Sequence, residues 1–125
     1  MKIYQHKILH LEDLDALDIN FIPEVFFLFA SPSFVGTEEF VGKLANKFEN
    51  AILIGCSTAG EILGNEVLDS TIALTAVKFE KTKIRMEEVD LVAHNLDSFA
   101  AGQALSHKLK GTDLRHIFVL SDGLI

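Results

Sequence analysis

The sequence has little cysteine, no tryptophan and no long uninterrupted apolar run. Its 125 residues include one cysteine, one tyrosine and two prolines. The single cysteine, Cys56, excludes an intramolecular disulfide, and the polar first residues lack the apolar stretch of a secretion signal. No segment approaches the roughly eighteen apolar residues that a membrane span requires. We therefore expect a cytoplasmic protein that does not insert into a membrane.

Basic residues are also scarce. The chain has 11 Lys and Arg against 18 Asp and Glu, which gives a formal net charge of −7. Nucleic-acid binding depends on clustered Lys and Arg, so this balance argues against DNA or RNA as a partner. In contrast, hydrophobic residues make up 49% of the chain and ten of them are Phe, which indicates one globular domain with a core rich in phenyl rings.

Three apolar segments stop at small or polar residues. Residues 25–30 run into Ser31, residues 52–55 run into the turn 56–61, and residues 117–120 run into the turn 121–123. Ligands of open α/β sheets collect beyond the carboxyl ends of the strands, so the three ends would share one sheet edge. Small residues also leave backbone amides uncovered for a carboxylate or a phosphate. The alternative is that strands need turn-forming residues simply to stop.

The order of elements predicts an α/β fold with a mixed sheet. A strand at 25–30, a helix from Thr37 to Asn50 and a strand at 51–55 form a right-handed βαβ unit with parallel strands. Residues 70–79 and 83–89 are both strand-like, and the link between them is too short for a crossover, so we expect an antiparallel hairpin.

The remaining segments complete this prediction. Residues 1–22 form a leader that the spacing of its leucines predicts to be helical, and residues 23–125 form the α/β domain. A second flanking helix begins at Asn95 or Asp97, and a last strand covers 116–120. Because the sequence stops shortly after Gly123, we expect a truncated part of a larger domain, whose bare sheet edge pairs with a further domain or with a second copy.

Three stretches resemble a known family. They are Phe27-Leu28-Phe29-Ala30-Ser31-Pro32, the run from Ile52 to Ile62 with its Cys-Ser-Thr-Ala-Gly-Glu core, and Leu120-Ser121-Asp122-Gly123-Leu124. In order and spacing they are similar to the N-terminal half of the FIST domain, over roughly residues 24–125. The resemblance implies a sensory module of bacterial signal-transduction proteins that binds small ligands such as amino acids. It also implies a C-terminal FIST half or a signalling output domain as a partner.

The resemblance and the strand ends together nominate one ligand site. The motif residues carried over from the family are Cys56, Ser57, Thr58, Gly60, Glu61, Ser121, Asp122 and Gly123. The strand-end argument adds Ser31 and Ala59. An amino acid presents two charges, so Glu61 could accept its amino group while the amides of the turn hold its carboxylate. The alternative is that Glu61 lies in the first turn of a helix and is stabilised there by the helix dipole.

An enzyme is the second class of function. Gly55-Cys56-Ser57-Thr58-Ala59 resembles a nucleophile elbow with Ala at its last position, so Ser57 is a candidate nucleophile. A hydrolase of that type needs a histidine after its acid, and none follows Asp122. Cys56 could act as a thiol nucleophile, but lone cysteines are more often small buried hydrophobic residues and no base is assigned to it. Catalysis is therefore not expected, and self-association through the sheet edge is the third alternative.

No metal or cofactor is predicted from the residues themselves. His6 and His10 are four residues apart and would share one face of a helix, but two ligands make a poor metal site. Surface histidines on the leader are the favoured interpretation. Some members of the family are described as haem-binding gas sensors, so haem is possible through the resemblance only.

Overall fold

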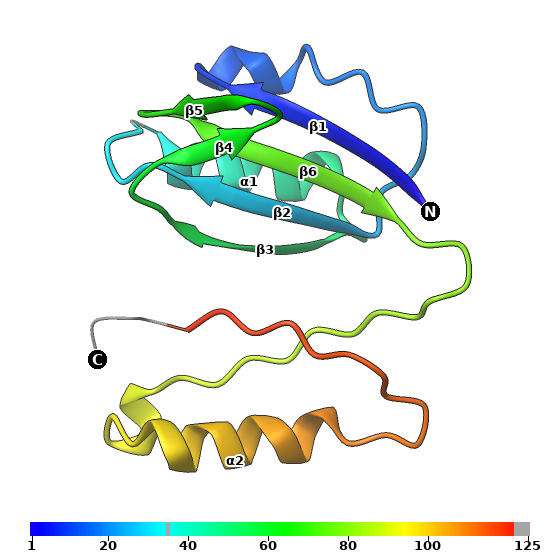
Figure 1. Ribbon diagram of the computed structural model, residues 1–125, viewed down its shortest axis with the longest axis vertical. Helices are drawn as coiled ribbons and strands as arrows, with labels where there is room; N and C mark the ends of the chain where they lie inside the picture. The colour runs from blue at the N-terminus through cyan, green and yellow to red at the C-terminus, as the bar shows by residue number, and fades with distance from the viewer. Residues whose placement is uncertain (35, 122–125) are drawn as a thin grey trace. The chain divides into compact units, whose positions relative to one another are not determined.

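The structure divides into two compact units. It is a computed structural model that describes residues 1–34 and 36–121, drawn in Figure 1. The first unit covers Met1–Ile84 and the second covers Arg85–Ile125. Each unit has its own secondary structure and is described separately below. No helix of the described residues is long and apolar enough to cross a membrane.

A mixed four-stranded sheet forms the centre of the first unit. Its strand order is β1-β6-β2-β3, and the strands are β1 (Lys2–Ile8), β6 (Ile72–Lys78), β2 (Val25–Ala30) and β3 (Ile52–Ser57). β2 is parallel to β3 and antiparallel to β6, which in turn is antiparallel to β1. The helix α1 (Thr37–Lys47) connects the two parallel strands. The predicted mixed α/β fold is confirmed, whereas the hand of the β2-α1-β3 connection stays a prediction.

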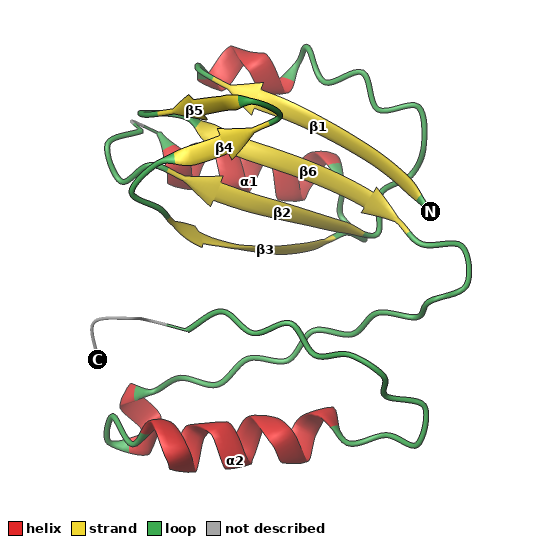
Figure 2. Cartoon of the chain, viewed as in Figure 1, coloured by secondary structure: helices red, strands yellow, loops and turns green. Residues whose placement is uncertain are grey.

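The main hydrophobic core lies on the face of the sheet that α1 covers. Figure 2 shows α1 on one side of the sheet and a small hairpin on the other. Alternate residues of β2, Phe26 and Leu28, point to the α1 side because side chains alternate along a strand. Phe40 and Leu44 reach the same core from α1, and both are fully buried. Phe26 also contacts Phe48, with ring centroids 5.0 Å apart.

Gly55 allows β2 and β3 to approach closely. It lies opposite Leu28 in the parallel register, and a Cβ atom at this position would stand 1.9 Å from the Leu28 carbonyl oxygen. No side chain can occupy that space. The glycine in the middle of β3 is therefore required for the pairing that places the end of β3 beside the end of β2.

The antiparallel hairpin is in a different place from the predicted one. The strands β4 (Glu61–Leu63) and β5 (Glu66–Leu68) form it, with Gly64 at a φ of +62° in the turn. The prediction that residues 70–79 pair with 83–89 is wrong. β6 uses both of its edges on β1 and β2, so no edge is left for another strand, and residues 83–89 belong to no helix or strand.

The predicted helix at the N-terminus is also wrong over most of its length. Lys2–Ile8 is the edge strand β1, and a single turn of 3-10 helix, η1 (Leu11–Leu14), follows it. Tyr4, His6 and Ile8 lie opposite Ala76, Leu74 and Ile72 of β6. This alternating set is a strand pattern, and the leucines that suggested a helix begin only after it. The boundary between a leader and a domain at residue 22 stays a prediction.

The second unit contains one full helix. α2 (Ser98–Leu109) begins after the N-cap Asp97, whose side chain accepts hydrogen bonds from the N–H groups of Phe99 and Ala100, as the sequence predicted. A 3-10 turn, η2 (Val92–His94), precedes it. The strand predicted at 116–120 is not found: these residues belong to no sheet of the described chain, and Ile117 and Val119 are exposed.

Candidate ligand site at the strand ends

The turn after β3 leaves backbone amides uncovered. Ser57 ends β3 opposite Ala30, and the Thr58 N–H extends the ladder by donating to the Ala30 carbonyl oxygen at 2.9 Å. Ala59 and Gly60 are exposed, and neither N–H group donates to another described residue. Two free amide donors therefore lie at the carboxyl end of a parallel strand.

Glu61 follows this turn and is almost fully buried, with an exposed fraction of 1%. Its two carboxyl oxygens accept hydrogen bonds from different parts of the chain. The Thr58 hydroxyl donates to Oε1 at 2.7 Å, and the Thr71 hydroxyl donates to Oε2 at 2.9 Å. Within the described chain no Lys, Arg or His forms an ion pair with Glu61. Its position as the first residue of β4 excludes the alternative that it begins a helix.

A chain of hydroxyl groups lies at the end of β2. The Ser31 N–H donates to the Thr71 carbonyl oxygen at 2.9 Å, and the Ser31 and Ser33 hydroxyl oxygens are 2.8 Å apart. The Ser33 hydroxyl is 2.9 Å from that of Ser70, and Asp69 Oδ1 accepts from the Ser70 N–H at 2.8 Å. Because β6 is antiparallel to β2, the residues that precede β6 meet the residues that follow β2.

The two candidate nucleophiles are not hydrogen-bonded to a histidine in the part of the chain that the structure describes. Cys56 and Ser57 are both exposed at the end of β3. Neither side chain forms a hydrogen bond to a histidine within the described residues. A serine or cysteine nucleophile needs such a base for activation. The geometry of the described turn therefore supplies hydrogen-bonding groups without an activated nucleophile.

The histidine pair at the N-terminus does not have helical geometry. His6 lies in β1, where its ring stacks on Tyr4 with centroids 5.9 Å apart, and His10 precedes η1. The expectation of a shared helix face is therefore wrong. No group of three or more His, Cys, Asp or Glu residues able to hold a metal ion occurs in the described part of the chain.

The family comparison identifies the chain. A family model described as the FIST N domain matches residues 24–125, which include the sheet strands β2, β3 and β6 and the turn at Cys56–Glu61. The chain belongs to the FIST N domain family. This family is a sensory type of domain in signal-transduction proteins. No curated protein and no solved structure shows significant similarity to the chain.

The structure brings together only some of the predicted site residues of this FIST N domain. Thr58 donates to Glu61 directly, and Thr71 connects Glu61 to Ser31. The exposed residues 56 and 57 end β3, and the exposed residues 59 and 60 lie in the turn that follows. Ser121 is exposed and belongs to the second unit. Asp122 and Gly123 lie outside the described residues.

Sequence reasoning missed the residues that precede β6. Thr71 donates to Glu61, while Ser70 and Asp69 belong to the hydroxyl chain. The signal was present: Asp69-Ser70-Thr71 is a polar run directly before a buried strand. The rule that ligands collect at the carboxyl ends of parallel strands does not cover this run, because an antiparallel neighbour contributes its amino end to the same edge.

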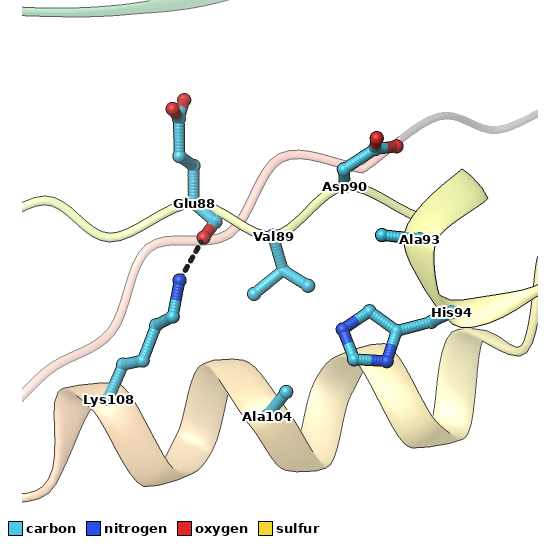
Figure 3. Close-up of a pocket in the computed structure, with 7 residues that line it drawn as sticks. All are labelled: Glu88, Val89, Asp90, Ala93, His94, Ala104 and Lys108. Carbon is cyan, nitrogen blue, oxygen red and sulfur yellow. Dashed lines mark hydrogen bonds between the residues drawn. The ribbon is translucent and has the colours of Figure 1, made fainter.

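An open groove of about 550 Å³ lies within the second unit (Figure 3). It is lined by Glu88, Val89, Asp90, Ala93, His94, Ala104 and Lys108. The Lys108 ammonium donates to the Glu88 carbonyl oxygen at 2.8 Å, and the Glu88 and Asp90 carboxyl groups point away from α2. None of these residues was predicted as a site residue.

Proposed function

We propose that this FIST N domain senses a small polar molecule, such as an amino acid, that binds at Cys56–Glu61, the segment formed by the end of β3, the turn after it and the first residue of β4. The observation that carries the proposal is that two amide groups without a hydrogen-bond acceptor among the described residues, on Ala59 and Gly60, directly precede the buried carboxyl group of Glu61. Free amides are suited to an anionic group and a carboxyl group to a cationic one. An amino acid presents both within one small molecule.

The site in this proposal consists of the ten residues that the sequence nominates. Those of the first unit are Ser31, Cys56, Ser57, Thr58, Ala59, Gly60 and Glu61, and the others are Ser121, Asp122 and Gly123. The hydroxyl groups of Ser31 and Ser57 would add hydrogen bonds to the ligand. Asp122 would add a second carboxyl group.

The proposed output is a shift in conformation. A ligand that contacts several residues of the site favours the conformation in which those residues lie close together over the one in which they lie apart. The shift in this equilibrium equals the difference between the ligand's binding free energies for the two conformations. We propose that this preference passes to a C-terminal FIST half, to an output domain or to a second copy of the chain. The setting that we propose is the cytoplasm, and no catalytic step or haem is part of the proposal.

Calorimetric titration with the twenty common amino acids tests the proposal. We expect saturable binding of at least one, and a loss of affinity of roughly tenfold or more in Glu61→Gln, because the ligand's ammonium group then lacks an anionic partner. Glu66→Gln is the matched control, since Glu66 lies on the same hairpin and pairs with Lys7 at the surface. Asp122→Asn, with Asp113→Asn as its control, tests in the same way whether residues 121–123 belong to the site.

Cys56 supplies an independent readout. It is the only cysteine of the chain and is exposed at the proposed site. A bound ligand should slow its alkylation by iodoacetamide. If the wild type, Glu61→Gln and Asp122→Asn bind the ligand with equal affinity, neither carboxyl group belongs to the site. If Cys56 is alkylated at the same rate with and without saturating ligand, the ligand binds elsewhere.

A further inference from the structure

The β4–β5 hairpin contributes little to its own stability. Each of its strands has three residues, and a two-stranded hairpin of this size is at best marginally stable in water. The cross-strand pair Ile62 and Val67 points outward, with exposed fractions of 71% and 79%. The hairpin must therefore be held by its contacts to the sheet beside it, shown in front of β6 in Figure 1.

Two polar contacts attach the hairpin to the sheet strands and their ends. Lys7 of β1 pairs with Glu66 at 3.1 Å, but both side chains are partly exposed, and such pairs contribute little. The other contact is Glu61, which is 1% exposed and receives the Thr58 and Thr71 hydroxyls. The loss of one donor would leave a buried carboxyl oxygen without a hydrogen bond, which costs more free energy than the loss of the Lys7–Glu66 ion pair.

We propose that Thr71 is a positioning residue that, together with Thr58, latches the hairpin over the strand ends through Glu61. The hairpin then acts as a flap: it is closed while both hydroxyls hold the carboxyl group and open when they release it. The flap deepens the proposed function and depends on it for its biological role, because the same carboxyl group that closes the hairpin is the one offered to the ligand.

The hydrogen bonds of Glu61 to the two threonines determine which chemical group a ligand needs in order to replace them. Glu61 has no cationic partner in the described residues, so an ammonium group competes with two neutral hydroxyls for its oxygens. Hydrogen bonds to a charged donor are stronger than those between neutral groups. A cationic group can therefore replace the hydroxyls, whereas a neutral or purely anionic molecule cannot. Gly60, which precedes Glu61 and is exposed, is the point where the chain would bend.

Amide hydrogen exchange of the ligand-free chain, followed by mass spectrometry, tests the latch. In Thr71→Val we expect exchange of the amides at 61–68 to rise roughly five- to hundredfold, because Glu61 Oε2 loses its donor. Thr71→Ser keeps a hydroxyl and should restore slow exchange. Thr75→Val is the matched control: Thr75 lies in β6, the strand that Thr71 directly precedes, and its hydroxyl accepts a hydrogen bond from the Gln5 side chain at the surface.

The outcomes separate a latch from a general structural role. If exchange in β2 and β6 rises as much as in the hairpin, Thr71 merely supports the fold and the proposal is overturned; it is also overturned if Thr71→Val leaves residues 61–68 unchanged. Thr58→Val gives a second route to the same result should Thr71→Val fail to fold. The exchange experiment contains no ligand, so it tests the latch separately from the proposed function. If the hairpin opens in Thr71→Val but Glu61→Gln binds amino acids as tightly as the wild type, the latch is kept and the proposed function is rejected.

Discussion

The two units of the chain use apolar residues in opposite ways. In the first unit, alternate apolar residues of β2 and β6 and the inner residues of α1 are buried in one continuous core that includes Phe26, Phe40 and Leu44. In the second unit, Ala101 is the one buried residue among those described, and large side chains such as Phe99 and Val92 are exposed. Both units nevertheless contain a helix and apolar runs.

This difference shows that an apolar run alone does not determine a strand. β2 is a strand with β3 and β6 on its two sides, whereas the apolar residues 117–120 belong to no strand of the described chain. α2 has a good N-cap in Asp97 and still exposes Phe99 at 74%. Local signals therefore determine where a helix begins, while tertiary contacts determine whether an apolar run becomes a buried strand.

Truncation of one phenylalanine in each unit tests the contrast most strongly. Phe26→Ala should lower the free energy of unfolding by about 3–5 kcal/mol, since Phe26 is fully buried and its removal leaves a cavity. Phe99→Ala should change it by less than about 0.5 kcal/mol. Denaturant unfolding followed by circular dichroism measures both. Similar losses in the two variants would show that Phe99 is buried in solution and would remove the contrast.

Replacing a glycine by alanine should lower the free energy of unfolding in the first unit and raise it in the second. Gly55→Ala should cost about 3 kcal/mol or more, because its Cβ atom would overlap the Leu28 carbonyl oxygen and separate β2 from β3. Gly102→Ala meets no atom within 4 Å and lies inside α2, so it should stabilise the helix by roughly 0.5–1 kcal/mol. Thermal unfolding of the two variants beside the wild type measures this. A Gly55→Ala protein as stable as the wild type would contradict the close approach.

The smallest expected effect concerns Asp13 in the first unit. The backbone N–H groups of His10 and Leu9 donate to its carboxylate and lower its pKa from the ordinary 3.8. A lowered pKa in the folded state adds stability above about pH 4, and this stability is lost as the pH falls through the lowered value. Asp13 is only partly buried, at the surface of the unit, so we expect no more than about 1 kcal/mol.

Acid unfolding curves of Asp13→Asn test this effect. The variant should be less stable than the wild type at pH 6, and the difference should shrink below pH 4. Glu12→Gln, at the neighbouring exposed position of η1, is the control. A difference that does not depend on pH would show that the Asp13 carboxylate does not carry the effect.

Much of the first unit's connectivity could be predicted from sequence. β2, α1 and β3 are a local sequence of strand, helix and strand, although β3 continues to Ser57, two residues beyond its predicted end at Gly55. β1 could not be assigned, because its alternation is mixed with polar residues and its partner, β6, is about seventy positions away. The hairpin was misplaced because Glu61–Leu68 is short and offers only Gly64 and Asn65 as turn signals.

The candidate site was predictable in part for a related reason. The run from Cys56 to Glu61 is contiguous, so its small residues and its carboxyl group stand out in the sequence. The donors to Glu61 come from both sides of it, and Thr71 becomes a neighbour only when β6 enters the sheet beside β2. Distances between such residues depend on strand order, which no local pattern contains.

The strand order also decides when this sheet can form during synthesis. β6 pairs with both β1 and β2, but it is the last of the four strands to leave the ribosome. Until Ile72–Lys78 has emerged, β1 has no neighbour, and the nascent chain can hold only β2, α1 and β3 together. The sheet of this protein is therefore completed from its middle, by a late strand that joins two pieces made earlier.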